Sequence, residues 1–275
     1  MSLMSMRPAE WINIVFFSLF VALAWIRKLP SQQRTKAARI GGAGAGLTLA
    51  ALYLRRILPA LTVSVIRDWL PAPLLLLAYW QTGAFVEAPN KGFQRKLGDL
   101  DLKLLRGCAH VDHGGSIAVQ NYFEFSYLLC YPLVPLGLGV LYLWHLRQNA
   151  DQYWAAILPA TYLCYVVLPF VQALPPRLLQ AEEEVQRDRS SIRRLNLWLL
   201  RHASIQVTTF PSAHVAATAA ASLALLQLVP LAGFVFLLLS LGIAIGAVKG
   251  RYHYALDVLL GAGLAVVVFV LEAVL

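Results

Sequence analysis

Charged residues are scarce in this chain. Asp, Glu, Lys and Arg together make up 13% of its 275 residues, whereas a soluble domain carries about 25%. Hydrophobic residues reach 59%, and the mean hydropathy is +0.64. This composition excludes an ordinary soluble domain, because too few charged side chains are present to cover its surface. It favours an integral membrane protein whose apolar residues face lipid.

Acidic residues are fewer than basic ones, 14 against 23, which gives a net charge of +9 and a pI near 9.7. Nucleic-acid binding would need a basic face on a folded soluble domain. Here the basic residues lie in the gaps between apolar runs. We therefore expect no nucleic-acid partner, and anionic lipid headgroups or phosphate are the better partners.

Cysteine is also rare. Cys108, Cys130 and Cys164 have no metal-ligand spacing, and two of them lie in apolar runs where a thiol usually acts as a small hydrophobe. The sequence contains no other cluster of metal ligands. We therefore expect neither a metal nor another cofactor, and we assign the cysteines no functional role.

The apolar residues gather in eight runs, most of them near the roughly 20 residues that a membrane-spanning helix needs. The first run is followed at once by two basic residues and lacks the small-residue cleavage site of a signal peptide, so we expect a retained anchor helix. The third is the weakest, because Arg67 and Asp68 precede it, and residues 55–82 could therefore thread differently. The predicted spans are residues 11–26, 38–54, 69–82, 122–144, 153–173, 213–229, 231–248 and 254–274.

These runs predict an all-α fold, a polytopic membrane helix bundle. Residues 1–68 would form about two N-terminal transmembrane helices, and residues 69–275 a six-helix membrane domain. Within the loop between the third and fourth spans, residues 90–106 repeat an apolar side chain every three or four positions, with charged residues between them. That period predicts an amphipathic helix lying in the membrane interface, and the alternative is a solvated loop over the bundle.

The second long loop, residues 174–212, leads into the sequence Pro-Ser-Ala-His at residues 211–214, where a new apolar run begins. A helix that starts here presents free N–H groups and a positive dipole to an anion. Ser212 would add a hydroxyl group, and His214 could protonate a leaving alkoxide. The alternative is an ordinary helix cap with a histidine at the membrane interface.

A second motif stands at the entrance to the last span. His253 and Asp257 are four residues apart, which places both on one face of a helix. The carboxylate can then hold a proton on one imidazole nitrogen and leave the other free for attack. The alternative is a structural pair that fixes the helix end. Because two spans separate this motif from His214, both motifs are expected at the same face of the membrane.

With the preceding Pro-Pro-Arg sequence that ends at Arg177, these motifs resemble the type 2 phosphatidic acid phosphatase superfamily, in particular the branch related to inositol phosphorylceramide synthases. The resemblance covers roughly residues 69–275. It implies that His253 attacks phosphorus to form a phosphohistidine, that Asp257 orients it, and that His214 is the acid. It also implies that Arg177 and Ser212 bind phosphate oxygens and that no metal is needed.

Three positions depart from the common phosphatase pattern. Phe170 stands where the pattern has a lysine seven residues before the first-motif arginine, Leu178 replaces the proline that follows that arginine, and Ala247 replaces an arginine six residues before the nucleophilic histidine. Lys249 or Arg251 could take over the lost phosphate contact, although Arg251 could equally be an interface anchor. The departures bring the chain closer to the phosphotransferase branch.

Three functions follow from these patterns. The leading one is a lipid phosphate phosphatase, in which water resolves the phosphohistidine. The second is a transferase, in which a lipid alcohol accepts the phospho-headgroup. The third, a transporter or non-catalytic scaffold, leaves the gathering of the motif residues unexplained. The partners are then a lipid phosphate and membrane lipids, and the sequence leaves the oligomeric state open.

The side of the membrane on which the motifs lie is ambiguous. With eight spans, 18 of the 23 lysines and arginines fall on the motif side, and the positive-inside rule would make that side cytoplasmic. The resemblance implies an extracytoplasmic or lumenal site instead. We expect an extracytoplasmic site, because phosphate-binding and interfacial arginines inflate the count.

Overall fold

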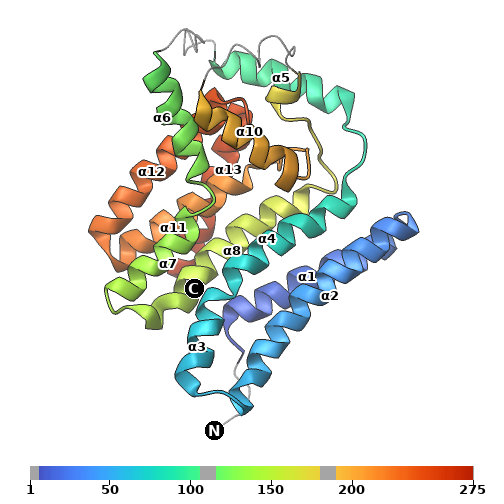
Figure 1. Cartoon of the computed structure of the whole chain (residues 1–275). Helices are drawn as coiled ribbons and strands as arrows, with labels where there is room; N and C mark the ends of the chain where they lie inside the picture. The colour runs from blue at the N-terminus through green and yellow to red at the C-terminus, as the bar shows by residue number, and fades with distance from the viewer. Residues whose placement is uncertain (1–5, 106–115, 180–189, 275) are drawn as a thin grey trace.

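Long apolar helices account for most of the chain. The computed structural model describes residues 6–105, 116–179 and 190–274, and over this part it forms a helical bundle with no β-strand (Figure 1). The α-helices are α1 (Pro8–Ile26), α2 (Ser31–Tyr53), α3 (Ala60–Trp69), α4 (Pro71–Thr82), α5 (Lys91–Leu105), α6 (Ile117–Leu128), α7 (Leu133–Leu143), α8 (Ala150–Val167), α10 (Ser191–Ala203), α11 (Ala213–Leu228), α12 (Pro230–Lys249) and α13 (Ala255–Val274). The predicted all-α membrane bundle is confirmed.

Within the described residues, five helical segments are long and apolar enough to cross a membrane: α1, α2 with the turn after it, α3 with α4, α12 and α13. A sixth span forms if α6 and α7, which meet at a bend of 70°, count as one broken span. Helix α11 is apolar but shorter, and α8 is almost wholly buried among α1, α4, α11 and α13. Each of the eight predicted runs therefore corresponds to a helix or a helix pair.

Two predicted spans have different bounds in the structure. The third, predicted as 69–82, is part of a 26-residue apolar segment from Ala60 to Phe85 that combines α3 and α4. Arg67 lies inside this segment because its guanidinium is paired with Glu10 of α1, with Nε 2.5 Å from Oε1. The fifth, predicted as 153–173, is α8 and ends earlier, at Val167.

The N-terminal hairpin packs directly on the other helices. Helix α2 approaches α1 closely at Gly44, where any side chain would collide with the Phe17 ring, as expected from the small residues of this stretch. On α1, Phe16 stacks on Tyr162 of α8 at a ring-centroid distance of 4.1 Å. The two N-terminal helices therefore share their core with α8, and the division into regions 1–68 and 69–275 stays a prediction.

Two shorter helices cover the end of the bundle where α13 begins (Figure 1). Helix α5 is the amphipathic helix predicted for residues 90–106: Leu97 is buried, and Leu100 and Leu104 are exposed. Helix α10 was not predicted and replaces part of the expected loop 174–212. It buries Arg193 and Asn196 together with Leu200 and exposes Leu195 and Trp198, so two of its large apolar side chains face away from the bundle.

Candidate active site

The turn between α12 and α13 positions a buried histidine against a carboxylate. The backbone N–H of His253 donates to the carbonyl of Ala247, which holds the turn against the last residues of α12. Nδ1 of His253 then lies 3.1 Å from Oδ2 of Asp257, one turn into α13. The predicted contact between these two side chains is therefore present, and their catalytic roles stay a prediction.

A third side chain joins this pair. The hydroxyl of Thr208 lies 3.0 Å from Nδ1 of His253 and donates to Oδ2 of Asp257 at 3.1 Å. The carboxylate thus accepts from both neighbours when Nδ1 carries the proton, which leaves Nε2 of the imidazole with its lone pair. We did not predict a role for Thr208, because its separation of 45 residues from His253 gives no local signal. The one available hint is its place next to the Pro-Ser-Ala-His motif.

Helix α11 carries the second histidine into the same region. Ser212 occupies the N-cap position, but the hydroxyl that accepts from the N–H of Ala213 belongs to Thr209. The predicted cap arrangement is therefore shifted: the helix begins after the proline rather than at it. The N–H of Ser212 donates to the backbone carbonyl of Asp257, which fastens α11 to α13. At Gly261 the two helices are so close that any side chain would collide with the Ser212 backbone.

Several buried polar atoms at this junction have no hydrogen-bond partner within the described residues: Oγ of Ser212, Nδ1 of His214 and Oδ1 of Asp257. The His214 ring lies 5.7 Å from the His253 ring, centroid to centroid, in an edge-to-face arrangement. Buried polar groups are nearly always satisfied in folded proteins. Unsatisfied groups beside two adjacent imidazoles are therefore a reason to expect that this position binds a polar ligand.

The positive charge nearest the histidines comes from Arg177, in the short 3-10 helix Pro176–Leu179. Its backbone N–H donates to the carbonyl of Arg251, which fixes this turn beside the start of α13. The guanidinium lies 6.0 Å from the centre of the Tyr252 ring. Burial lowers the pKa of Arg177, because a desolvated cation loses its hydration. An anionic ligand in contact with the guanidinium would replace that lost stabilisation.

Arg177, Thr208, His214 and His253 line a common pocket, whereas Ser212 and Asp257 are fully buried and do not line it. Its free volume is about 20 Å³, enough for one water molecule, so a phosphate ester can enter only if the walls separate. Leu200 and Ser204, at the end of α10, form part of those walls. The other lining residues are Tyr79, Tyr127, Arg177, Val207, Thr208, Thr209, His214, Tyr252 and His253.

Two of the predicted phosphate-binding residues lie elsewhere. The ammonium of Lys249 sits 4.4 Å from the centre of the Phe123 ring on α6. Arg251 is exposed in a left-handed conformation, with φ of 56°, and it reaches the site through its backbone carbonyl. Neither side chain lines the pocket. Two of the positions that depart from the phosphatase pattern have structural contacts. The carbonyl of Ala247 accepts hydrogen bonds from the turn that carries His253. Phe170 is exposed, and the centre of its ring lies 5.5 Å from the Arg27 guanidinium.

A buried carboxylate outside the predicted motifs fixes Tyr252, the residue before His253. Glu124 on α6 accepts from Arg193 at 2.8 Å, from Asn196 at 2.7 Å and from the hydroxyl of Tyr252. The Tyr252 ring is stacked on that of Tyr127 at 3.9 Å. This network joins α6 and α10 to the turn that carries the histidine. Sequence reasoning missed it because its members are spread over more than a hundred residues.

Across residues 6–105, 116–179 and 190–274, no three His, Cys, Asp or Glu side chains lie close enough together to hold a metal ion. The site therefore contains the groups for proton transfer, nucleophilic attack and anion binding, all supplied by side chains of the chain itself. The expectation that the reaction needs no metal stays a prediction, which chelation can test.

Comparison with known proteins agrees with this arrangement. The sequence profile of the PAP2 superfamily matches residues 111–271, which include the Arg177, Pro-Ser-Ala-His and His253–Asp257 segments. No curated protein and no solved structure gives a significant match. Because the profile covers more than half of the chain and the helices form a membrane bundle, this integral membrane protein belongs to the type 2 phosphatidic acid phosphatase superfamily.

Proposed function

We propose that the chain is a lipid phosphate phosphatase that works through a phosphohistidine intermediate. One observation carries the proposal: a pocket in which His253, hydrogen-bonded to Asp257, lies beside the His214 ring and Arg177. Membership of the PAP2 superfamily supplies the phosphatase-type chemistry. The apolar helices around the pocket supply the membrane in which a lipid substrate is dissolved.

In the first step, Nε2 of His253 attacks the phosphorus atom. A P–N bond forms as the P–O bond to the lipid breaks, and His214 protonates the departing alkoxide. Arg177 places a fixed positive charge beside the phosphate oxygens. The hydroxyl of Ser212, which has no partner among the described residues, donates to one of those oxygens.

In the second step, water attacks the phosphohistidine. The P–N bond breaks, inorganic phosphate leaves, and His214, which is neutral after the first step, takes the proton from the water. Both histidines return to their starting protonation states. Throughout the cycle Asp257 and Thr208 keep the proton on Nδ1 of His253, so Nε2 is the nitrogen that bonds to phosphorus.

A lipid substrate is favoured by the surface that borders the pocket. Helix α10, whose end forms part of the pocket wall, exposes Leu195 and Trp198, with Trp198 55% exposed. Arg194 and Arg201 are exposed on the same helix. Apolar and basic side chains together on one exposed face are typical of a helix lying in the headgroup region of a membrane.

A transferase is the second candidate, and a specific contact favours it. Tyr131, at the bend between α6 and α7, is 39% exposed, and its ring lies edge-on to His214 at 5.8 Å. His214 is the base of the second step, so an acceptor that reaches it past Tyr131 arrives from the apolar side of the bundle. A lipid alcohol such as ceramide or diacylglycerol would approach this way.

The purified protein should release phosphate from phosphatidic acid, and this is the first test. His253→Gln should reduce turnover to background, because no neighbouring group can form the phosphoenzyme. His214→Gln should lose about 10²–10⁴-fold on phosphatidic acid but recover much of the rate on p-nitrophenyl phosphate, whose leaving group needs no proton. His202→Gln is the matched control, because His202 is exposed and bonds within its own helix.

Further assays with the purified protein distinguish the phosphatase from the transferase and test the phosphohistidine mechanism. Phosphatidylinositol plus ceramide, scored for new phospholipid against free phosphate, distinguishes the transferase from the phosphatase. Vanadate, which mimics a pentacoordinate phosphate, should inhibit, and EDTA should not. Normal turnover of His253→Gln on every substrate, or loss of activity on chelation, would contradict the phosphohistidine mechanism.

A further inference from the structure

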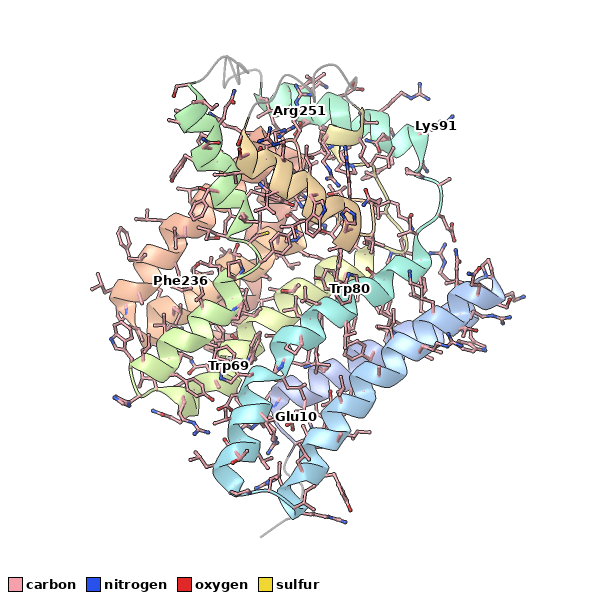
Figure 2. All side chains as sticks on the ribbon, in the orientation of Figure 1. Glu10, Trp69, Trp80, Lys91, Phe236 and Arg251 are labelled. Atoms are coloured by element: carbon pink, nitrogen blue, oxygen red, sulfur yellow. The ribbon has the colours of Figure 1, made fainter. Side chains whose placement is uncertain are left out.

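A second cavity lies at the other end of the bundle. Its volume is about 250 Å³, several times the ~30 Å³ share of one water molecule. Figure 2 labels Glu10, near this cavity, and Arg251, near the candidate active site, at opposite ends of the molecule. The side chains that line the cavity come from the N-terminal segment, α3, α8 and the turn before α8: Arg7, Ser64, Asp68, Arg147, Gln148 and Asp151.

The inner part of this cavity is firmly bonded. Asp68 is 3% exposed and accepts from Arg7 and from the Tyr142 hydroxyl, both at 2.6 Å. Ser64 accepts from Arg7 at 3.1 Å and from Arg147 at 2.8 Å. These bonds hold the two guanidiniums side by side and fix the inner wall of the cavity.

The outer part is loosely bonded. Arg147 is 29% exposed and lies 3.4 Å from Asp68, and Asp151 is 38% exposed and lies 3.5 Å from Arg7. Charge-assisted hydrogen bonds are normally about 2.7–2.9 Å long. The outer guanidinium and the outer carboxylate therefore keep bonding capacity toward the cavity, with opposite charges.

The charge balance of the lining selects among ligands. Two guanidiniums and two carboxylates face the cavity and balance in charge, so an added anion or cation would leave a net charge there. A zwitterion avoids both penalties, since its anionic part can bond Arg147 and its cationic part Asp151. The volume suits a headgroup rather than a whole lipid.

Two exposed tryptophans stand close in the chain to residues that line the cavity. Trp11, one turn into α1 from Arg7, is 56% exposed, and Trp144, at the end of α7, is 53% exposed. Tryptophan is enriched where headgroups meet acyl chains. A ligand with a polar end in the cavity and apolar chains along these side chains is a phospholipid.

We propose that this cavity binds the headgroup of a zwitterionic phospholipid, with the phosphodiester on Arg147 and Arg7 and the ammonium on Asp151. The site lies in the leaflet opposite the candidate active site, so it does not depend on the proposed function. A bound lipid there would connect α1, α3 and α8 at the end of the bundle where no catalytic side chain lies.

Native mass spectrometry of the purified chain, with phosphatidylethanolamine and phosphatidylglycerol at equal concentration, tests the proposal. The wild type should retain phosphatidylethanolamine about tenfold better, the contribution of one charge-assisted hydrogen bond. Asp151→Asn should abolish that preference, because it removes the partner of the ammonium, whereas Arg147→Gln should weaken the retention of both lipids, because both carry the phosphodiester. Arg55→Gln, an exposed arginine outside the lining, should keep it. Phosphoethanolamine should displace the lipid from the wild type, a measurement that does not depend on any variant folding correctly.

The alternatives give different results. Equal retention of both lipids by the wild type would overturn the proposal. So would an Asp151→Asn variant that has a lower melting temperature but keeps the preference, because the cavity would then only hold ion pairs between helices. If phosphoethanolamine binds saturably but the diacyl lipid does not compete with it, the ligand is a soluble zwitterion and the lipid assignment fails.

Discussion

At the residue scale, Thr208 is the side chain on which the geometry of the candidate nucleophile depends. Its hydroxyl contacts Nδ1 of His253 and Oδ2 of Asp257. Since Asp257 is fully buried and its Oδ1 has no hydrogen-bond partner among the described residues, the bond from the Thr208 hydroxyl to Oδ2 contributes to stabilising the carboxylate. Removing it should loosen the imidazole without altering the volume of the site.

Thr208→Val tests this positioning role. A hydrogen bond to a charged group contributes about 1.5–3 kcal/mol, so kcat on phosphatidic acid should fall by about 10–100-fold while KM changes little. Thr208→Ser keeps the hydroxyl and should restore most of the rate, and the pH profile of kcat should shift in the valine variant alone. A valine variant with a lower melting temperature and an unchanged kcat would mean that Thr208 is only structural.

Residues joined by local spacing were predictable from the sequence, and residues joined through the fold were not. His253 and Asp257 are one helical turn apart, so their contact follows from the α-helical repeat. Thr208 and Glu124 reach the same turn from segments far away in the chain. Lys249 and Arg251 were near in sequence, but the end of α12 directs one toward Phe123 and leaves the other exposed.

At the scale of elements, α5 caps α13, the helix that carries Asp257 of the candidate catalytic pair. Asp101 of α5 accepts a hydrogen bond from the backbone N–H of Ala255, the first residue of α13. A carboxylate at a helix N-terminus is stabilising because free N–H groups and the positive end of the helix dipole meet there. Gln94 of α5 also bonds the backbone of Leu174, so α5 is attached to both sides of the site.

The charge on Asp101 should make this attachment sensitive to pH. Burial raises its pKa above the ordinary value of 3.8; the Ala255 N–H opposes that rise, and Asp257 adds to it. A folded-state pKa above the unfolded one favours folding of the protonated form. This stability is fully present below pH 3.8 and is lost as the pH rises through the raised pKa.

Asp101→Asn measures this effect, because asparagine stays neutral and still offers an oxygen to Ala255. The melting temperature of the wild type in detergent should fall relative to that of Asp101→Asn as the pH rises from about 3.5 to 7. Asp99→Asn, at an exposed position of the same helix, should show no such trend. A constant difference between wild type and Asp101→Asn over this range would rule out the titration of Asp101.

The spacing of apolar residues predicted α5 but not α10, because the two helices bury different kinds of side chain. Helix α5 follows the usual rule, with Leu97 buried against the bundle. Helix α10 buries Arg193 and Asn196, which bond to Glu124, and exposes apolar side chains. Because Arg193 and Asn196 are buried while Leu195 and Trp198 are exposed, the burial of α10 does not follow side-chain polarity, and the segment resembles a charged loop in sequence.

At the scale of the whole molecule, a buried ion pair connects the first helix to the third. Glu10 accepts two hydrogen bonds from Arg67, and both side chains are less than 8% exposed. Glu10→Gln breaks the buried ion pair with Arg67 and should destabilise the fold by about 3–5 kcal/mol. Adding Arg67→Met should recover much of that loss.

Unfolding in detergent, followed by tryptophan fluorescence, measures this coupling. Glu272→Gln, an exposed position of α13, is the matched control and should change stability little. If Glu10→Gln and the double variant were equally unstable, the loss would come from Glu10 itself and not from an unpaired charge.

The eight apolar runs could be predicted as membrane helices from the sequence because a bilayer requires helices of a minimum length. The path of residues 55–82 could not be predicted in the same way, because Arg67 and Asp68 indicate a loop unless their buried partners are known. Glu10 and Arg7 are those partners, and both stand more than fifty residues earlier in the chain. With Arg67 and Asp68 paired in this way, α3 and α4 together form one apolar segment long enough to cross the membrane.

The contacts of Arg27 show at which end of the bundle the loop after α1 lies. Arg27 donates to the backbone carbonyl of Pro169 and pairs with Glu87 at 3.8 Å, so the loop after α1 lies at the same end of the bundle as the candidate active site. The spans predicted from the sequence assign 18 of the 23 basic residues to that side of the membrane. Several of them are already engaged by the protein: Arg27 by this pair, Arg193 by Glu124. The count therefore overstates the free positive charge that the positive-inside rule weighs.

We expect the active-site end to be extracytoplasmic, and single cysteines in an otherwise cysteine-free chain can test it. Ser31→Cys and Ser191→Cys, both exposed at that end, should react with a membrane-impermeant maleimide on intact cells. Arg56→Cys, exposed at the opposite end, should react only after permeabilisation. If both serine positions required permeabilisation and Arg56→Cys did not, the site would face the cytoplasm as the basic residues alone indicate. If Ser31→Cys and Ser191→Cys labelled from different sides, α3 and α4 could not form one span, and the arrangement of the N-terminal helices would be wrong.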